Sequence, residues 1–305
     1  MYTFKLFYHP IYTYGIDKNS KFPRERYELI KEKLEEEKIL IDFQKPDLAE
    51  FEDIILGHDE RYVNSFINGL LSQGEIRKIG LQPWTKDIIN RTLYILGGSI
   101  EAMKSAIKGK NLAGNMAGGT HHAHFSYGSG YCIFNDLAIC AIKAIREFKE
   151  VNKVLIIDLD VHQGDGTATI LETYKNIFTF SMHCQNNFPL KKVRSDLDVP
   201  LERGMLDNEY LGILEKNIET FKKQDIDLIL FQAGVDILQE DSLGYLKISR
   251  NGVMKRNKVV LDFANEKKVP LVIFMGGGYS KPIQYSVNSF VDLFYQCSKY
   301  AALFN

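Results

Sequence analysis

The stretch from Val154 to Gly166, VLIIDLDVHQGDG, constrains this chain more than any other. It begins as an apolar run of the kind that a fully buried parallel strand carries. Asp158, Asp160 and His162 then occupy alternate positions, and side chains two residues apart on a strand point to the same face. Burying two carboxylates is costly unless a positive group compensates them, and a divalent metal ion is the simplest such group. The stretch therefore predicts a buried strand that ends at a metal site.

The rest of the chain alternates apolar strands with amphipathic helices. Further strands are expected at 3–8, 177–183, 228–232 and 269–275, and helices at 24–41, 61–71, 87–108, 132–147, 167–173, 210–224, 253–266 and 285–303. This alternation predicts an α/β fold, a central and mostly parallel sheet with helices on both faces. No linker, internal repeat or low-complexity block divides the chain, so we expect one domain over residues 1–305. Ligands of such sheets bind beyond the carboxyl ends of the strands. The candidate polar residues of this chain also lie at or just after the ends of the expected strands.

Composition sets broad limits on function. The 305 residues include 38 basic and 39 acidic side chains, a net charge of −1 that gives no support to direct nucleic-acid binding. We find no apolar run long enough to span a bilayer and no signal-peptide pattern. The four cysteines fit neither a disulfide framework nor a structural zinc site. We therefore expect a cytoplasmic protein without a membrane span, while nuclear use and use as a secreted effector stay open.

Two ligands for a catalytic metal come from the opening stretch. A hydrolytic zinc ion needs three protein ligands and an open position for water. Asp160 and His162 supply two of them, and Asp236, which follows an apolar strand in QAGVD, is the best-placed third. Spacing alone leaves open whether Asp236 binds a metal or caps the next helix.

A second motif, His121-His122, follows two glycines in a glycine-rich loop. Adjacent histidines near a metal site are typical of acid–base groups, and each needs a partner to set its tautomer and its pKa. Asp158 and Asp165 of the opening stretch are available for this purpose. His124 is nearby, but we interpret it as a loop residue rather than a catalyst.

A third motif places Tyr279 directly after three glycines. Glycines let the backbone approach a ligand closely, so this tyrosine could donate a hydrogen bond to a substrate oxygen as negative charge develops there. A tyrosine that merely packs under a glycine turn is the alternative.

Taken together, these motifs resemble the zinc-dependent histone deacetylase family, which has the single-domain arginase/deacetylase fold. The matching blocks run in family order: AGGTHHA (117–123), GSGYCIFND (128–136), IIDLDVHQGDGT (156–167), FTFSMH (178–183), NNFP (186–189), RSDLDVPL (194–201), FQAGVD (231–236) and GGGY (276–279). The first block, the SMH, NFP and RSDLD segments and the GGGY ending are more similar to class IV and its bacterial relatives than to class I.

The resemblance implies metal ligands at the matching positions. Asp160, His162 and Asp236 would bind one catalytic zinc ion. A potassium ion would bind beside it through Asp158, the main-chain oxygens of Asp160 and His162, Ser181 and Met182.

It also implies catalytic roles. His122 would act as the general base, with Asp165 behind it, and His121 would be mainly electrostatic, with Asp158 behind it. Tyr279 would polarise the scissile carbonyl together with the zinc ion.

Substrate contacts follow from the same resemblance. Tyr131 and Phe188 would form the aromatic walls of an acyl-lysine tunnel, and Gly130 would contact the acyl-lysine amide. The family usually has phenylalanine where this chain has Tyr131. Some relatives carry an arginine in an inner channel, and Arg24 and Arg26 are the candidates for it.

The function that the resemblance implies is zinc-dependent hydrolysis of the amide of Nε-acyl-lysine in proteins or peptides, with long acyl chains preferred if the class IV likeness holds. One alternative is an amidohydrolase of acetylpolyamines or other small molecules. An alternative of another class is a catalytically weak acyl-lysine-binding protein.

Overall fold

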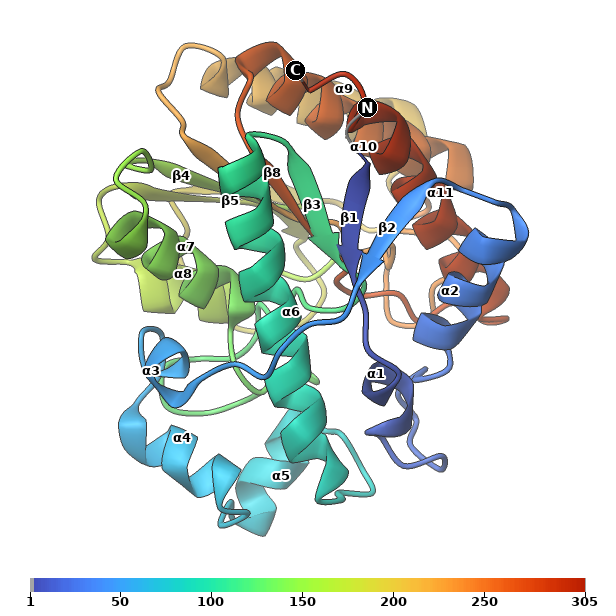
Figure 1. Ribbon diagram of the computed structural model, residues 1–305. Helices are drawn as coiled ribbons and strands as arrows, with labels where there is room; N and C mark the ends of the chain where they lie inside the picture. The colour runs from blue at the N-terminus through green and yellow to red at the C-terminus, as the bar shows by residue number, and fades with distance from the viewer. Residues whose placement is uncertain (1–2, 305) are drawn as a thin grey trace.

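An eight-stranded sheet forms the centre of the structure, a computed structural model that describes residues 3–304 (Figure 1). The strands follow the order β2-β1-β3-β8-β7-β4-β5-β6, and each neighbouring pair is parallel. They are β1 (Phe4–Phe7), β2 (Ile41–Gln44), β3 (Leu112–Asn115), β4 (Val154–Asp158), β5 (Ile177–Cys184), β6 (Leu197–Leu201), β7 (Leu228–Gln232) and β8 (Leu271–Phe274).

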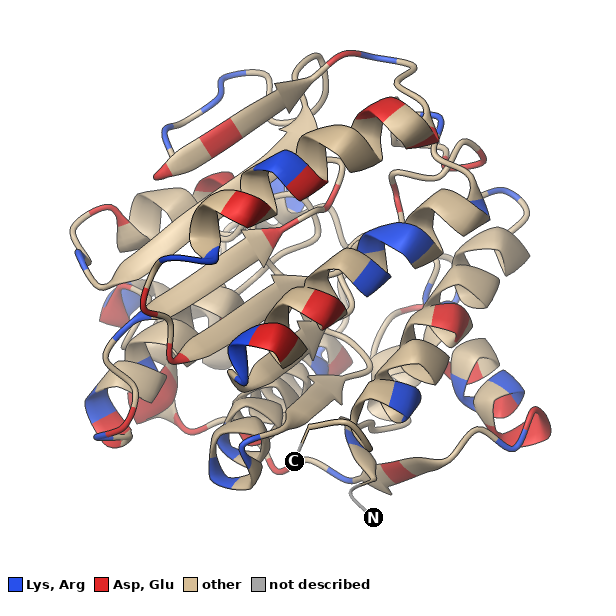
Figure 2. Cartoon of the chain, turned by 90° about the horizontal axis from the view of Figure 1, so that it is seen from above, with Lys and Arg blue, Asp and Glu red and all other residues tan. Residues whose placement is uncertain are grey.

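Helices cover both faces of this sheet. They are α1 (Ile11–Tyr14), α2 (Arg26–Glu36), α3 (Phe51–Ile54), α4 (Glu60–Ile67), α5 (Gln73–Ile79), α6 (Asp87–Gly109), α7 (Asp136–Glu147), α8 (Asp165–Leu171), α9 (Asp207–Phe221), α10 (Arg250–Lys267) and α11 (Gln284–Tyr300). The long helix α6 packs against β1, β3 and β8, with α7 beside it, and α10 packs between α9 and α11. Figures 1 and 2 show these two groups of helices on opposite faces of the sheet.

Strand β4 lies in the interior of the sheet and all five of its residues are buried. Burial on both faces explains its continuous apolar sequence. The register pairs Asp158, its last residue, with Ser181 on β5 and with Gln232 on β7. Because the strands are parallel, the segments that follow β4, β7 and β8 leave the sheet at the same edge, which assembles the candidate site there.

The predicted α/β fold class is confirmed. Three strands, β2, β3 and β6, are not among those expected from the sequence. The helix expected over 24–41 ends at Glu36, because Lys38 adopts a left-handed backbone (φ +52°) before the chain enters β2. Strand β3 has four residues including Gly114, and β6 is an edge strand that contains Pro200. Glycine and proline both weaken a strand pattern, so neither segment stands out in the sequence.

One hydrophobic core cluster runs through the described chain, from Phe4 near its start to Phe304 at its end. The expectation of a single domain over residues 1–305 stays a prediction, and residues 1, 2 and 305 lie outside the described range.

Charged residues of both signs are interspersed along the outer helices (Figure 2). Within residues 3–304, no helix has the length and apolar character needed to cross a membrane.

Candidate metal and acid–base site

Asp160, His162 and Asp236 converge at the carboxyl edge of the sheet. All three are buried, and one potential ligand atom from each lies within 4.8 Å of the others. Nδ1 of His162 is 3.0 Å from Oδ1 of Asp160 and 3.2 Å from Oδ2 of Asp236. The first two residues follow β4 and the third follows β7, so neighbouring parallel strands bring them together.

Backbone amides orient the two carboxylates. Gly277 N donates to Oδ2 of Asp160 at 2.9 Å, and Val161 N donates to Oδ1 of Asp236 at 2.9 Å. A Cβ on Gly277 would overlap Oδ2 of Asp236, so the turn after β8 requires glycine at that position.

Arg256, on α10, supports the same loops from behind. It is fully buried and donates through Nη1 to the carbonyls of Leu159 (3.2 Å) and Gly234 (2.8 Å). These carbonyls precede Asp160 and Asp236, so one arginine ties the two ligand loops together. The sequence signal for it is an arginine on the apolar face of a helix, three residues after Val253.

The donor set fits a divalent metal ion. Oδ2 of Asp236 is buried, and among the described residues its polar contact is the 3.2 Å approach of Nδ1 of His162. Burial, reinforced by the charge of Asp160, raises the pKa of Asp236 to about 7. Burial opposes protonation of His162, but its hydrogen bonds to both carboxylates raise its pKa to about 10. Two carboxylates with one imidazole are a set that zinc binds, with the ligands deprotonated.

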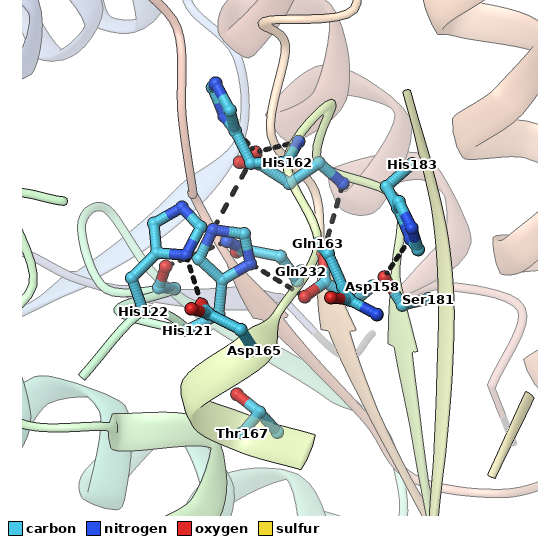
Figure 3. Close-up of polar contacts among 12 residues, drawn as sticks. His121, His122, Asp158, His162, Gln163, Asp165, Thr167, Ser181, His183 and Gln232 are labelled. Atoms are coloured by element: carbon cyan, nitrogen blue, oxygen red, sulfur yellow. Dashed lines mark hydrogen bonds and ion pairs between the residues drawn. The ribbon is translucent and has the colours of Figure 1, made fainter. Parts of the chain in front are cut away.

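The two predicted histidines lie side by side next to His162 (Figure 3). The ring centroids of His121 and His122 are 4.0 Å apart. Nδ1 of His121 is 2.8 Å from Oδ2 of Asp158, and Nδ1 of His122 is 2.7 Å from Oδ1 of Asp165. A carboxylate accepts from a protonated Nδ1, so each aspartate leaves Nε2 of its histidine available for chemistry.

The two histidines differ in charge. Burial lowers the pKa of His121, but the carboxylates of Asp158 and Asp160 outweigh this effect and raise it to about 9. Burial and the positive charge of His121 lower the pKa of His122 to about 3, against the attraction of Asp165. At neutral pH His122 is therefore the neutral histidine, with an Nε2 lone pair that can accept a proton.

The loop that carries the histidines is held by two polar residues at the start of α7. Asp136 accepts from the backbone N–H groups of Gly119 (3.0 Å) and Thr120 (2.8 Å). Asn135 caps α7 and donates to the carbonyl of His121 at 3.3 Å. The sequence interpretation assigns neither residue a role, although an Asn-Asp pair directly before an apolar helix is a recognisable cap signal.

His124, which we interpret from the sequence as a loop residue, also contacts Asp165. Its Nε2 is 3.1 Å from Oδ2 of Asp165, and its Nδ1 is 3.0 Å from Oγ1 of Thr169. Asp165 therefore binds two histidines, one through each oxygen. Burial opposes ionisation of Asp165, but the hydrogen bonds from His122 and His124 hold its pKa well below the ordinary value.

Tyr279 lines the cavity in front of the metal group. Its N–H donates to Oδ2 of Asp241 at 2.6 Å, and its carbonyl accepts from Oγ of Ser242 at 2.6 Å. Burial raises the pKa of Tyr279 well above the ordinary value, so its hydroxyl stays a hydrogen-bond donor. Asp241 thus positions this tyrosine, and nothing in the sequence pattern singles it out.

Gly130, Tyr131 and Phe188 line the same cavity, whose volume is about 260 Å³. Gly130 (φ +53°) and Tyr131 (φ +67°) both have left-handed backbones, a conformation that is costly for a tyrosine and typical of functional sites. The ring of Tyr131 is 5.8 Å from that of Tyr279, and Phe188 meets His122 edge-on at 4.8 Å.

Of the residues predicted for potassium, Asp160 and His162 line the cavity, whereas Asp158, Ser181 and Met182 do not. Ser181 pairs with Asp158 across the sheet, and its Oγ is 2.9 Å from Nδ1 of His183. Met182 follows on β5 and is buried. Potassium binding stays a prediction.

Comparisons with known proteins agree with this geometry. A family model described as histone deacetylase domain matches residues 20–293. The chain is 41% identical over 283 residues to an uncharacterised protein of Picosynechococcus, covering 92% of this chain and 93% of that one. It is 32% identical over 282 residues to histone deacetylase 2 of Arabidopsis thaliana, covering 88% and 71%. It is 30% identical over 260 residues to the acetoin utilization protein AcuC of Staphylococcus aureus, covering 77% and 66%.

Proposed function

The chain belongs to the histone deacetylase family of hydrolases, and on that premise we propose that it hydrolyses the amide of Nε-acyl-lysine in proteins or peptides, including acyl chains longer than acetyl. One observation carries the proposal. A buried Asp-His-Asp group, a neutral histidine and a protonated tyrosine lie at one cavity, and they match the metal ligands, the proton acceptor and the oxyanion donor of metal-assisted amide hydrolysis.

A zinc ion held by Asp160, His162 and Asp236 would supply Lewis-acid chemistry toward the scissile carbonyl and toward water. His122 accepts a proton from water through Nε2 while the water oxygen bonds to the carbonyl carbon. Tyr279 donates a hydrogen bond to the carbonyl oxygen as negative charge develops, an interaction typically worth about 3–4 kcal/mol. The C–N bond then breaks, and a histidine returns the proton to the leaving lysine nitrogen. The products are a carboxylic acid and the lysine amine, which at neutral pH become a carboxylate and an ammonium group by transfer of one proton.

The walls of the cavity suit the lysine side chain. Phe188 and Tyr131 present apolar ring surface, and a lysine side chain carries four methylene groups. Leu243 and Tyr245 lie at the mouth, where they are 38% and 39% exposed and available to residues that flank the lysine.

The decisive test combines metal content with turnover. We expect about one zinc ion per purified chain by elemental analysis, and hydrolysis of acyl-lysine peptides that is lost after chelation. Asp160→Ala should lose both the metal and nearly all activity. Asp225→Ala, which removes an aspartate whose side chain is 89% exposed, is the matched control and should keep both. Full activity of Asp160→Ala would refute the zinc site.

Tyr279→Phe tests the oxyanion role. It should lower kcat by about 100- to 1,000-fold while the metal content stays unchanged. A loss of less than threefold would count against that role.

A substrate panel separates the proposal from its alternatives. Acyl-lysine peptides from acetyl to long-chain fatty acyl should be turned over faster than acetylated polyamines. The reverse order would indicate a small-molecule amidohydrolase. Turnover no greater than that of zinc-stripped protein would indicate a binding protein.

A further inference from the structure

Two buried cations line the cavity without taking part in the proposed reaction. Arg26 on α2 and Arg91 on α6 are only 3% and 5% exposed. Within residues 3–304 their hydrogen bonds go to uncharged groups. Arg26 donates to the carbonyl of Gly278 at 3.1 Å, and Arg91 donates to the carbonyl of Tyr12 at 2.9 Å. Both also donate to the hydroxyl oxygen of Tyr27, at 3.1 and 3.0 Å.

This arrangement gives the two guanidinium groups only uncharged hydrogen-bond partners among the described residues. Two guanidinium groups within reach of one oxygen repel each other, and burial removes the water that would screen them. Nε of Arg26 is buried with no hydrogen-bond partner among the described residues. Arg24, the other arginine of this segment, does not line the cavity and donates instead to the carbonyls of Thr13 and Ile16. Arg26 and Arg91 therefore form a cationic pair with no carboxylate among its hydrogen-bond partners within residues 3–304.

The pair lies close to the reacting centre. Cζ of Arg26 is 5.8 Å from the ring centroid of Tyr279. The ring of Phe22 is 5.0 Å from Cζ of Arg26, 5.6 Å from Cζ of Arg91 and 6.3 Å from the ring of Tyr279. The mouth residues are partly exposed, whereas both arginines are buried. An acyl chain whose carbonyl reaches Tyr279 from the mouth would continue toward the guanidinium groups.

A carboxylate is the group that matches this inner end. Guanidinium donors form charge-assisted and often bidentate hydrogen bonds with carboxylates, and a phenol can add a further one. A hydrocarbon chain of the same length would exclude water from the two guanidinium groups without supplying a hydrogen-bond acceptor or a negative charge. Building on the proposed function, we infer that the preferred substrates carry an acyl chain that ends in a carboxylate, as in succinyl- or glutaryl-lysine.

A matched pair of substrates tests the inference in the zinc-loaded enzyme. Glutaryl-lysine and pentanoyl-lysine peptides have acyl chains of equal length and differ only in the terminal carboxylate or methyl group. We expect kcat/KM for glutaryl-lysine to exceed that for pentanoyl-lysine by at least about 10-fold, which corresponds to a hydrogen bond to a charged group. Equal values, or faster hydrolysis of acetyl or fatty acyl chains, would overturn the inference.

Variants locate the effect. Arg91→Gln should reduce the glutaryl-to-pentanoyl ratio by about 10-fold or more. Arg146→Gln, which changes an exposed arginine on α7, should leave the ratio as it is. An unchanged ratio in folded Arg91→Gln would overturn the assignment. If Arg91→Gln does not fold by circular dichroism, the substrate comparison in the unaltered enzyme decides.

Binding of the acyl amides separates this inference from the proposed function. By calorimetry, glutarate monoamide should bind at least about 10-fold more tightly than pentanamide, which has no carboxylate, and Arg91→Gln should remove the difference. If no acyl-lysine is hydrolysed but this preference holds, the proposed function fails and the carboxylate pocket stands. If glutarate monoamide binds preferentially but glutaryl-lysine is not the better substrate, the pocket does not select substrates and the substrate inference fails.

Discussion

The two histidine–aspartate pairs have the same hydrogen-bond pattern but lie in regions of opposite electrostatic character. His121 and Asp158 lie on the metal side, where Nε2 of His121 is also 3.8 Å from Oδ1 of Asp160. Asp165 lies at the start of α8, and Phe188 meets the ring of its partner His122 edge-on. The pKa of His121 is about 9 and that of His122 is about 3.

The difference shows that the aspartate partner alone does not set the charge of a histidine. Both partners are 2.7–2.8 Å away. His121 gains a second carboxylate in Asp160, whereas His122 faces the cation that His121 becomes. One fold thus holds one charged and one neutral imidazole in contact, which suits an electrostatic group beside a base.

The largest expected effect concerns the neutral histidine. His122→Ala should lower kcat by about 100- to 10,000-fold, because it removes the group that accepts the proton of water. His121→Ala should lower kcat less, since the proposed zinc ion would carry the main positive charge. Steady-state kinetics of the two folded, zinc-loaded variants give the comparison. An equal or larger loss in His121→Ala would reverse the assignment of the base.

The pH dependence of stability provides the next test, in metal-free protein. His121 binds a proton more tightly in the folded state (pKa about 9) than at its ordinary pKa of 6.5. Its contribution is therefore complete below pH 6.5 and is lost as the pH rises through about 9, a change of about 3 kcal/mol in the free energy of unfolding. His122 acts in the opposite sense, because its lowered pKa removes stability as the pH falls from 6.5 toward 3.

Urea unfolding at pH 6, 8 and 10 measures this change, with His121→Gln as the control that cannot titrate. The stability difference between the two proteins should shrink as the pH rises. A difference that stays constant from pH 6 to 10 would show that the surroundings of His121 do not favour its charged form.

The smallest expected effect concerns His124, the second partner of Asp165. His124→Ala removes one hydrogen bond to this carboxylate and should lower kcat by about 10-fold with KM nearly unchanged. His124→Gln, which can still donate to Oδ2 of Asp165, should restore most of the loss. If His124→Ala has full activity, the hydrogen bond of His122 is sufficient to hold Asp165.

Prediction from the sequence succeeded where a pattern is local. The bounds of β7, 228–232, agree with expectation, and α6 starts at the expected residue, Asp87. Strands β3 and β6 were not predicted, because short strands that contain glycine or proline are stabilised mainly by their neighbours in the sheet. The roles of Asp136, Asp241 and Arg256 were not predicted for a related reason, since these residues form hydrogen bonds with backbone groups that are distant in the sequence.

The sequence by itself determined which residues could form the site. The spacing of Asp158, Asp160 and His162 and the motifs at 121–122 and 276–279 indicated these residues, although β4 ends at Asp158 and the other two lie in the loop that follows it. Tertiary structure alone decided how those residues are charged and what else faces the cavity. The neutral state of His122 and the pairing of Arg26 with Arg91 across one tyrosine oxygen depend on burial and on distances between separate elements. These quantities exist only once the chain has folded, because they set the local desolvation and the Coulomb interactions between groups that are far apart in the sequence.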